Sequence, residues 1–71
     1  MNLAINGKQT NVADDLTIGQ LLIKENVKMP QMVSVELNGR ILKRTEFEET
    51  ILRENDKVEF LYFMGGGSVT H

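Results

Sequence analysis

The chain contains no cysteine and only one histidine among its 71 residues. The absence of cysteine excludes a disulfide scaffold, a zinc site built on thiolates and a cysteine nucleophile. The single histidine is the last residue, His71, and no cluster of His, Asp and Glu accompanies it. We therefore expect no metal site.

Excess charge of one sign and long apolar runs are also missing. The net charge is −2, with both signs spread along the chain, whereas nucleic-acid binders usually carry a basic patch. No apolar run approaches the length of a membrane-spanning helix. Residues 1–6 lack the basic start and apolar stretch of a signal peptide. We expect a soluble cytoplasmic protein that binds neither nucleic acid nor membrane.

The length allows one small domain, which needs an economical core. Leu3 and Ile5 alternate with other residues as in a short strand, and the following Asn6-Gly7 is a strong hairpin signal because both residues tolerate positive φ. Residues 8–12 are the expected returning strand. The chain is thus predicted to open with a β-hairpin.

A short amphipathic helix is predicted next. Thr17 and Gln20 have the spacing of a capping box, in which each side chain satisfies a backbone amide at the helix start. The helix should end near Asn26, because Met29-Pro30 prevents its continuation. One face of this helix is apolar and should cover the sheet; it carries Ile18, Leu21 and Leu22.

Two further strands and a tight turn follow the helix. Residues 33–37 alternate between apolar and polar side chains, as in a half-buried strand. The turn Asn38-Gly39 should lead into a short edge strand over residues 41–43. Thr45 and Glu48 are expected to cap one helical turn around Phe47.

The last predicted strand covers residues 57–63 and is apolar on consecutive residues at its end. A central strand buried on both faces has this pattern, and so has a strand whose second face meets a partner. Val58 and Phe60 should face the core. Leu61 and Phe63 then lie on the opposite face.

The order of these elements resembles the β-grasp fold of ubiquitin, an α+β fold with a mixed four- to five-stranded sheet packed on one helix. The sequence is similar to the ThiS-like sulfur-carrier proteins of thiamine biosynthesis over nearly the whole chain up to Gly67. We expect a β-grasp domain over residues 1–64 and a flexible glycine-rich tail over residues 65–71. The matching segments are Asn6-Gly7, Thr17-Ile18, Leu21-Leu22, Val35 to Gly39, Asp56 to Glu59 and Phe63 to Gly67.

The resemblance implies a carrier that is not itself an enzyme and binds no cofactor. A partner, a ThiF-like adenylating enzyme, uses ATP to activate the C-terminal carboxylate, which becomes a thiocarboxylate. This group then donates sulfur to thiazole synthase or another acceptor enzyme. Gly66 and Gly67 are the implied sulfur-carrying terminus, and Gly65 belongs to the part of the tail that threads into the partner. Glycines suit a narrow tunnel because they have no side chain, and a chain without cysteine has this carboxylate as the place left for sulfur.

Four residues, Ser68 to His71, follow the glycine that ends mature members of that family. An internal Gly67 carbonyl is an amide and cannot be adenylated. We expect a peptidase to remove the four residues first. The alternatives are an added end without a role, or a carrier that ends at Gly66.

Two surface features and two other functions stay open at this point. Leu61, Phe63 and Met64 are candidates for docking the adenylating enzyme, or they pack against a neighbouring strand or the tail. The acidic residues around Glu46 and Glu48 are either a solvated face or a guide for a basic partner. The other functions are a carrier for methionine, cysteine or molybdopterin synthesis, and a ubiquitin-like interaction module that carries no sulfur.

Overall fold

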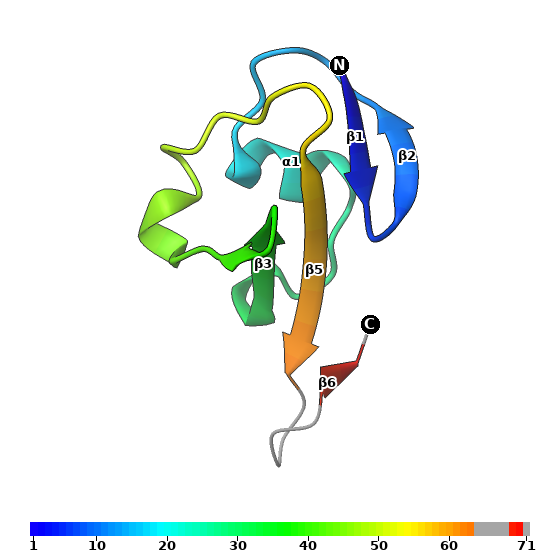
Figure 1. Ribbon diagram of the computed structural model, residues 1–71. Helices are drawn as coiled ribbons and strands as arrows, with labels where there is room; N and C mark the ends of the chain where they lie inside the picture. Colours follow the sequence, from blue (N-terminus) through cyan, green and yellow to red (C-terminus); the bar gives the residue numbers. More distant parts are fainter. Residues whose placement is uncertain (64–68, 71) are drawn as a thin grey trace.

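The structure is a computed structural model that describes residues 1–63 and 69–70. These residues form one α-helix, two short 3-10 helices and six strands (Figure 1). In chain order the elements are β1 (Asn2–Ile5), β2 (Lys8–Asn11), α1 (Ile18–Lys24), η1 (Pro30–Met32), β3 (Val33–Leu37), β4 (Arg40–Ile41), η2 (Arg44–Glu46), β5 (Lys57–Phe63) and β6 (Val69–Thr70).

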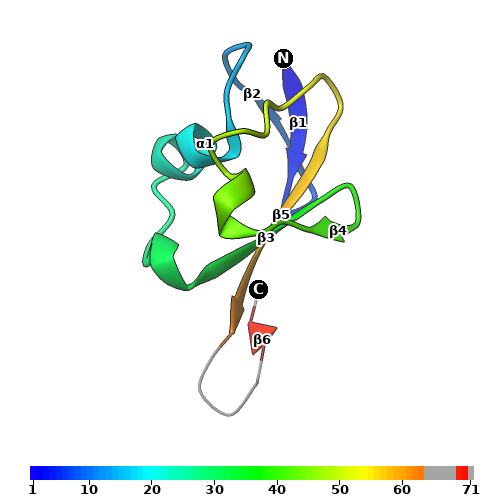
Figure 2. The same cartoon turned by 90° about the vertical axis from the view of Figure 1, so that its left-hand side faces the viewer.

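The strands form a mixed sheet with the order β2-β1-β5-β3-β4. β1 is parallel to β5, and the other pairs along this order are antiparallel. The helix α1 lies on one face of the sheet (Figures 1 and 2). These features confirm the predicted β-grasp arrangement, with the last long strand at the centre. The short β6, which pairs with the end of β5, was not expected.

Both hairpins turn at an Asn-Gly pair. Asn6 and Gly7 have φ of 51° and 81°, and Asn38 and Gly39 have φ of 50° and 88°. This left-handed geometry at both central residues matches the twist of the flanking strands. The second turn places Arg40 directly opposite the end of β3. For this reason β4 covers residues 40–41, one residue earlier than the predicted start.

The helix begins with the predicted capping box. The hydroxyl of Thr17 accepts a hydrogen bond from the Gln20 amide at 3.2 Å, and the side-chain oxygen of Gln20 accepts one from the Thr17 amide at 2.9 Å. The helix ends at Lys24 and is followed by Asn26 in the left-handed conformation, with φ of 53°. This exit geometry is common after helix ends.

The predicted cap around Phe47 is wrong. The tight turn η2 begins earlier, after Lys43, and the carboxylate of Glu46 accepts a hydrogen bond from the Lys43 amide at 2.8 Å. This bond holds the pKa of Glu46 below its ordinary value. The turn is placed by Arg44, whose guanidinium donates to the backbone carbonyls of Pro30 and Gln31 in η1 and of Val33 at the start of β3, at 2.6 to 3.0 Å. The guanidinium also lies 5.6 Å from the centre of the Phe47 ring.

The core lies between α1 and the sheet. It includes the apolar face of α1 and the residues of β5 that point toward it, Val58 and Phe60. The buried apolar residues are Leu3, Ile5, Val12, Ile18, Leu21, Leu22, Val33, Val35, Leu42, Phe47, Leu52, Val58 and Phe60.

No helix in the described part of the chain has both the length and the apolar character needed to cross a membrane.

Candidate functional site

The candidate site is the C-terminal end of β5, because the glycine run follows this strand in the sequence after one residue, Met64. The start of β5 is held by its parallel neighbour. The Ala4 amide donates to the Asp56 carbonyl and the Asn6 amide to the Val58 carbonyl, both at 2.9 Å. On its other side, β5 pairs with all five residues of β3. The strand that precedes the glycine run in the sequence is thus anchored at the centre of the sheet.

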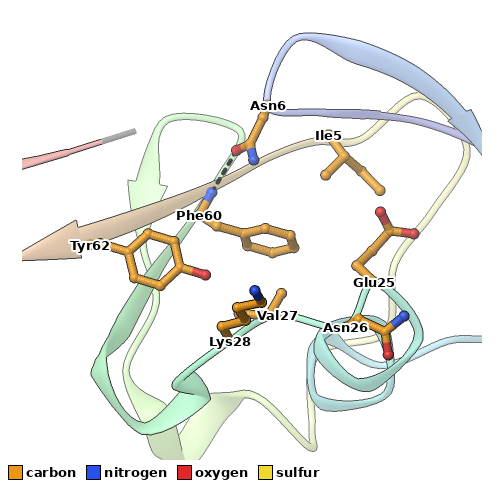
Figure 3. A pocket seen from close by; sticks show the side chains of 8 residues that line it. All are labelled: Ile5, Asn6, Glu25, Asn26, Val27, Lys28, Phe60 and Tyr62. Atoms are coloured by element: carbon orange, nitrogen blue, oxygen red, sulfur yellow. Dashed lines mark hydrogen bonds between the residues drawn. The ribbon is translucent and has the colours of Figure 1, made fainter.

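A side chain ends the ladder between β1 and β5. The side-chain oxygen of Asn6 accepts a hydrogen bond from the Phe60 amide at 2.9 Å (Figure 3). Asn6 can reach this amide because it occupies the first position of the β1–β2 turn in the left-handed conformation. After Asn6 the chain turns back into β2, whereas β5 continues past Phe60 to Phe63.

Leu61 lies on the face of the sheet that points away from α1, as predicted. It is partly exposed, whereas its neighbour Phe60 is buried. Directly paired residues share one face of a sheet. The pairings of β5 with β3 and of β3 with β4 therefore extend this face, which we call the outer face and define by Ser34, Glu36, Ile41, Glu59 and Leu61.

The outer face includes residues that the sequence reading did not single out. Ile41 is 51% exposed and lies opposite Glu36, which lies opposite Glu59. The sequence contained the signal for this placement. A two-residue Asn-Gly turn aligns Ile41 with Glu36, and the alternation of β3 points Glu36 outward. The candidate docking surface therefore combines two aliphatic side chains, Ile41 and Leu61, with two carboxylates.

The remaining predicted site residues lie outside what the structure describes. Phe63 ends β5 by its backbone, but its side chain is outside the described part of the molecule, as are Met64 and the glycines Gly65, Gly66 and Gly67. Their predicted roles in docking and in carrying sulfur stay predictions.

Several acidic side chains maintain local structure. Glu46 pairs with Arg40 at 3.3 Å in addition to accepting the Lys43 amide. Glu54 accepts the Asn2 amide at 3.1 Å. Asp56 accepts a hydrogen bond from the Arg53 amide at 2.8 Å and one from the Asn38 side chain at 2.9 Å.

Among the described residues, no group of three His, Asp or Glu side chains is placed to hold a metal ion.

Comparison with known proteins agrees with this fold. The family model described as the ThiS family matches residues 3–67 and thus ends at Gly67. A crystal structure of the thiamine biosynthesis protein ThiS from Geobacter metallireducens superposes with a TM-score of 0.88 and 48% identity, covering 94% of this chain and all of that chain. A solution structure of a thiamine biosynthesis protein from Geobacter metallireducens has a TM-score of 0.77 and 46% identity, covering all of this chain and 94% of that chain.

Two proteins named thiazole synthase are also similar. The one from Paramagnetospirillum magneticum is 34% identical over 68 residues, which cover 96% of this chain and 21% of that protein. The one from Magnetococcus marinus is 31% identical over 67 residues, which cover 94% of this chain and 20% of that protein. The chain thus spans about a fifth of the length of these relatives. Because the family model covers nearly all of its sequence, the chain belongs to the ThiS family.

Proposed function

We propose that the chain is the sulfur carrier for formation of the thiazole of thiamine. The observation that carries this proposal is the match to the ThiS family from residue 3 to Gly67. The match ends at the residue whose carboxylate would be activated. It also includes the whole of β5, the anchored strand from which the tail departs.

The chemistry takes place on the backbone terminus. A partner adenylating enzyme would join the Gly67 carboxylate to AMP and release pyrophosphate from ATP. A sulfur donor would then displace AMP and leave a thiocarboxylate. The carrier supplies the substrate carboxylate and the docking surface, and ATP binds to the partner. The adenylate must be shielded from water, which favours a narrow site that a glycine tail can enter.

We propose thiazole synthase as the sulfur acceptor. Proteins with that name contain a region similar to nearly the whole of this chain. A carrier region within the same polypeptide as its acceptor would meet it at a high effective concentration. This relation favours the thiazole pathway over methionine, cysteine or molybdopterin synthesis.

The residues after Gly67 must be absent before activation. The family match stops at Gly67, and the Gly67–Ser68 amide has no carboxylate to adenylate. We propose that a peptidase cleaves this bond. Since activation consumes ATP, we place the process in the cytoplasm.

The proposed function is tested by measuring the intact mass of two chains after incubation with ATP, a sulfide source and the adenylating enzyme of the same organism. The chain ending at Gly67 should gain the mass of one exchange of oxygen for sulfur. The full chain of 71 residues should keep its mass. If the chain ending at Gly67 also keeps its mass, the carrier function is wrong and an interaction module is favoured.

Replacing Leu61 by serine should weaken docking with little loss of stability. Leu61 is partly exposed on the outer face. Removing an apolar side chain that anchors an interface would cost about 1.4 kcal/mol or more, which is about a ten-fold loss of affinity. Surface positions contribute about 0.5 kcal/mol or less to folding. The measurements are the Kd for the adenylating enzyme and the thermal unfolding midpoint.

The adjacent Phe60 provides the matched control, since Phe60→Ser places a hydroxyl in the core and should unfold the domain. If Leu61→Ser unfolds the domain as Phe60→Ser does, Leu61 belongs to the core. If it folds and binds like the unchanged chain, the outer face is not the docking surface.

A further inference from the structure

The last described residues form a strand on the open edge of β5. Thr70 lies opposite Tyr62, and Val69 lies opposite Phe63, in antiparallel register. On its other side, Tyr62 is already paired with Val33 of β3. β6 therefore occupies the edge of β5 that β1 borders earlier in the strand (Figure 1).

The backbone of Tyr62 faces this edge. The Phe60 amide points toward β1, because it donates to the side chain of Asn6. Along a strand, the backbone groups of alternate residues point to the same side. The N–H and C=O of Tyr62 consequently point to the side where β1 has ended at Ile5. β6 lies opposite these groups.

A cavity opens beside the same edge. It has a volume of about 450 Å³ and lies between β5 and the segment that follows α1 (Figure 3). Phe60, Tyr62 and Val27 supply an apolar lining, while Glu25 and Lys28 supply one charge of each sign. A residue paired with Tyr62 would share its face of the sheet. The edge thus offers both backbone partners and a space for one side chain of an added strand.

We propose that the edge of β5 at Tyr62–Phe63 is a strand-addition site for an extended segment of the adenylating enzyme, and that Val69–Thr70 occupies this site in the uncleaved chain. Unpaired strand edges accept added strands readily. That the chain's own β6 sits there shows that the edge accepts an antiparallel strand in this register. Cleavage after Gly67 then has two effects, since it creates the carboxylate and uncovers the edge. The partner named here rests on the proposed function.

The adenylating enzyme is the occupant that the order of events favours. It must bind the chain directly after cleavage, when β6 has just left, and before any acceptor receives sulfur. The uncleaved chain is accordingly a latent form in which edge and carboxylate are both blocked.

The first test needs no partner. We would measure amide hydrogen exchange in the full chain, in the chain ending at Gly67 and in the full chain with Thr70→Pro, which removes the N–H opposite Tyr62. The Tyr62 amide should exchange about ten-fold faster or more in the second and third chains. The Leu61 amide faces β3 and should be unchanged in all three. Equal exchange at Tyr62 in the three chains would overturn the proposal.

The second test measures binding without chemistry. Chains ending at Gly67 carry a C-terminal amide, which cannot be adenylated, and their Kd for the adenylating enzyme of the same organism is compared between Tyr62→Pro and Tyr62→Ala. Both variants lose the side chain, but only proline loses the edge N–H. Tyr62→Pro should bind about ten-fold more weakly than Tyr62→Ala. The full chain with Thr70→Pro, in which β5 is unaltered, should bind several-fold more tightly than the unchanged full chain.

The two proposals fail in different ways. If the chain ending at Gly67 exchanges oxygen for sulfur, but Tyr62→Pro binds like Tyr62→Ala and Thr70→Pro binds like the full chain, the strand-addition site is wrong and the carrier function holds. If no exchange of oxygen for sulfur occurs, the carrier function is wrong. In that case the adenylating enzyme is also not the partner that binds at the edge of β5.

Discussion

In a chain that ends at Gly67, replacing Gly66 by tryptophan is expected to slow adenylation about 100-fold or more and to leave thermal unfolding unchanged. The tail must place the Gly67 carboxylate against the phosphate of ATP in a site that excludes water. A large side chain one residue away would keep the tail from entering, and a displacement of about 1 Å of reacting groups can cost about 100-fold in rate. The measurement is pyrophosphate release with the adenylating enzyme, beside a thermal melt.

Two variants make this prediction specific. Gly66→Ala should reduce the rate less than Gly66→Trp, since the effect depends on side-chain size. Gly19→Ala adds a methyl group in α1, where the nearest side-chain or backbone neighbour of the new carbon would be 3.8 Å away, so it should leave adenylation unchanged. A Gly66→Trp chain that is activated as fast as the unchanged chain would show that the tail does not thread.

Replacing Leu21 by alanine is expected to destabilise the domain by about 3 kcal/mol. Leu21 is fully buried between α1 and the sheet, and Leu→Ala substitutions in cores cost about 2–5 kcal/mol. A domain of this length has a free energy of unfolding of about 4–10 kcal/mol. The midpoint of thermal unfolding should therefore fall by about 12–24 °C, as measured by circular dichroism.

The matched control lies on the same helix. Ile23 is 78% exposed, so Ile23→Ala removes a similar aliphatic side chain from water and should change the stability by about 0.5 kcal/mol or less. If the two substitutions have equal effects, the helix does not bury the face that contains Leu21.

These predictions separate the roles of the two faces of the sheet. The face toward α1 holds the domain together, and changes there should act on stability before they act on binding. The outer face and the end of β5 add little to the core and should act on the partner. The two kinds of residue alternate along β5 itself, as Phe60 and Leu61 show, so neighbouring substitutions can be compared within one strand.

Local patterns in the sequence were sufficient for most of the elements. A two-residue hairpin turn of this type requires left-handed backbone at both central residues, and Asn-Gly is one of the few pairs that accept it. Both hairpins were therefore predictable from the sequence. Thr17 and Gln20 satisfy each other's amides over three residues, so the helix start was predictable as well. The alternation of β3 specified which of its side chains face the core.

The turn near Phe47 shows where local patterns were insufficient. Thr45-Glu48 and Lys43-Glu46 both have the spacing that places an acidic side chain over a preceding amide. The choice depended on Arg44, which donates to carbonyls of η1 and of the first residue of β3, more than ten residues earlier in the sequence. Sequence spacing carries no information about such a contact.

The sequence by itself determined the order of hairpin, helix and strands ahead of the three glycines, because turns, caps and alternation depend on neighbours within a few positions, and this order resembles the β-grasp fold. Tertiary structure decided what surrounds the end of β5. Asn6 ends the ladder at Phe60, 54 residues away, and β6 lies on the edge that this leaves open. Ile41 joins Leu61 on one face through β3. Each of these features depends on which strands are neighbours, and that order follows from packing the whole sheet against α1.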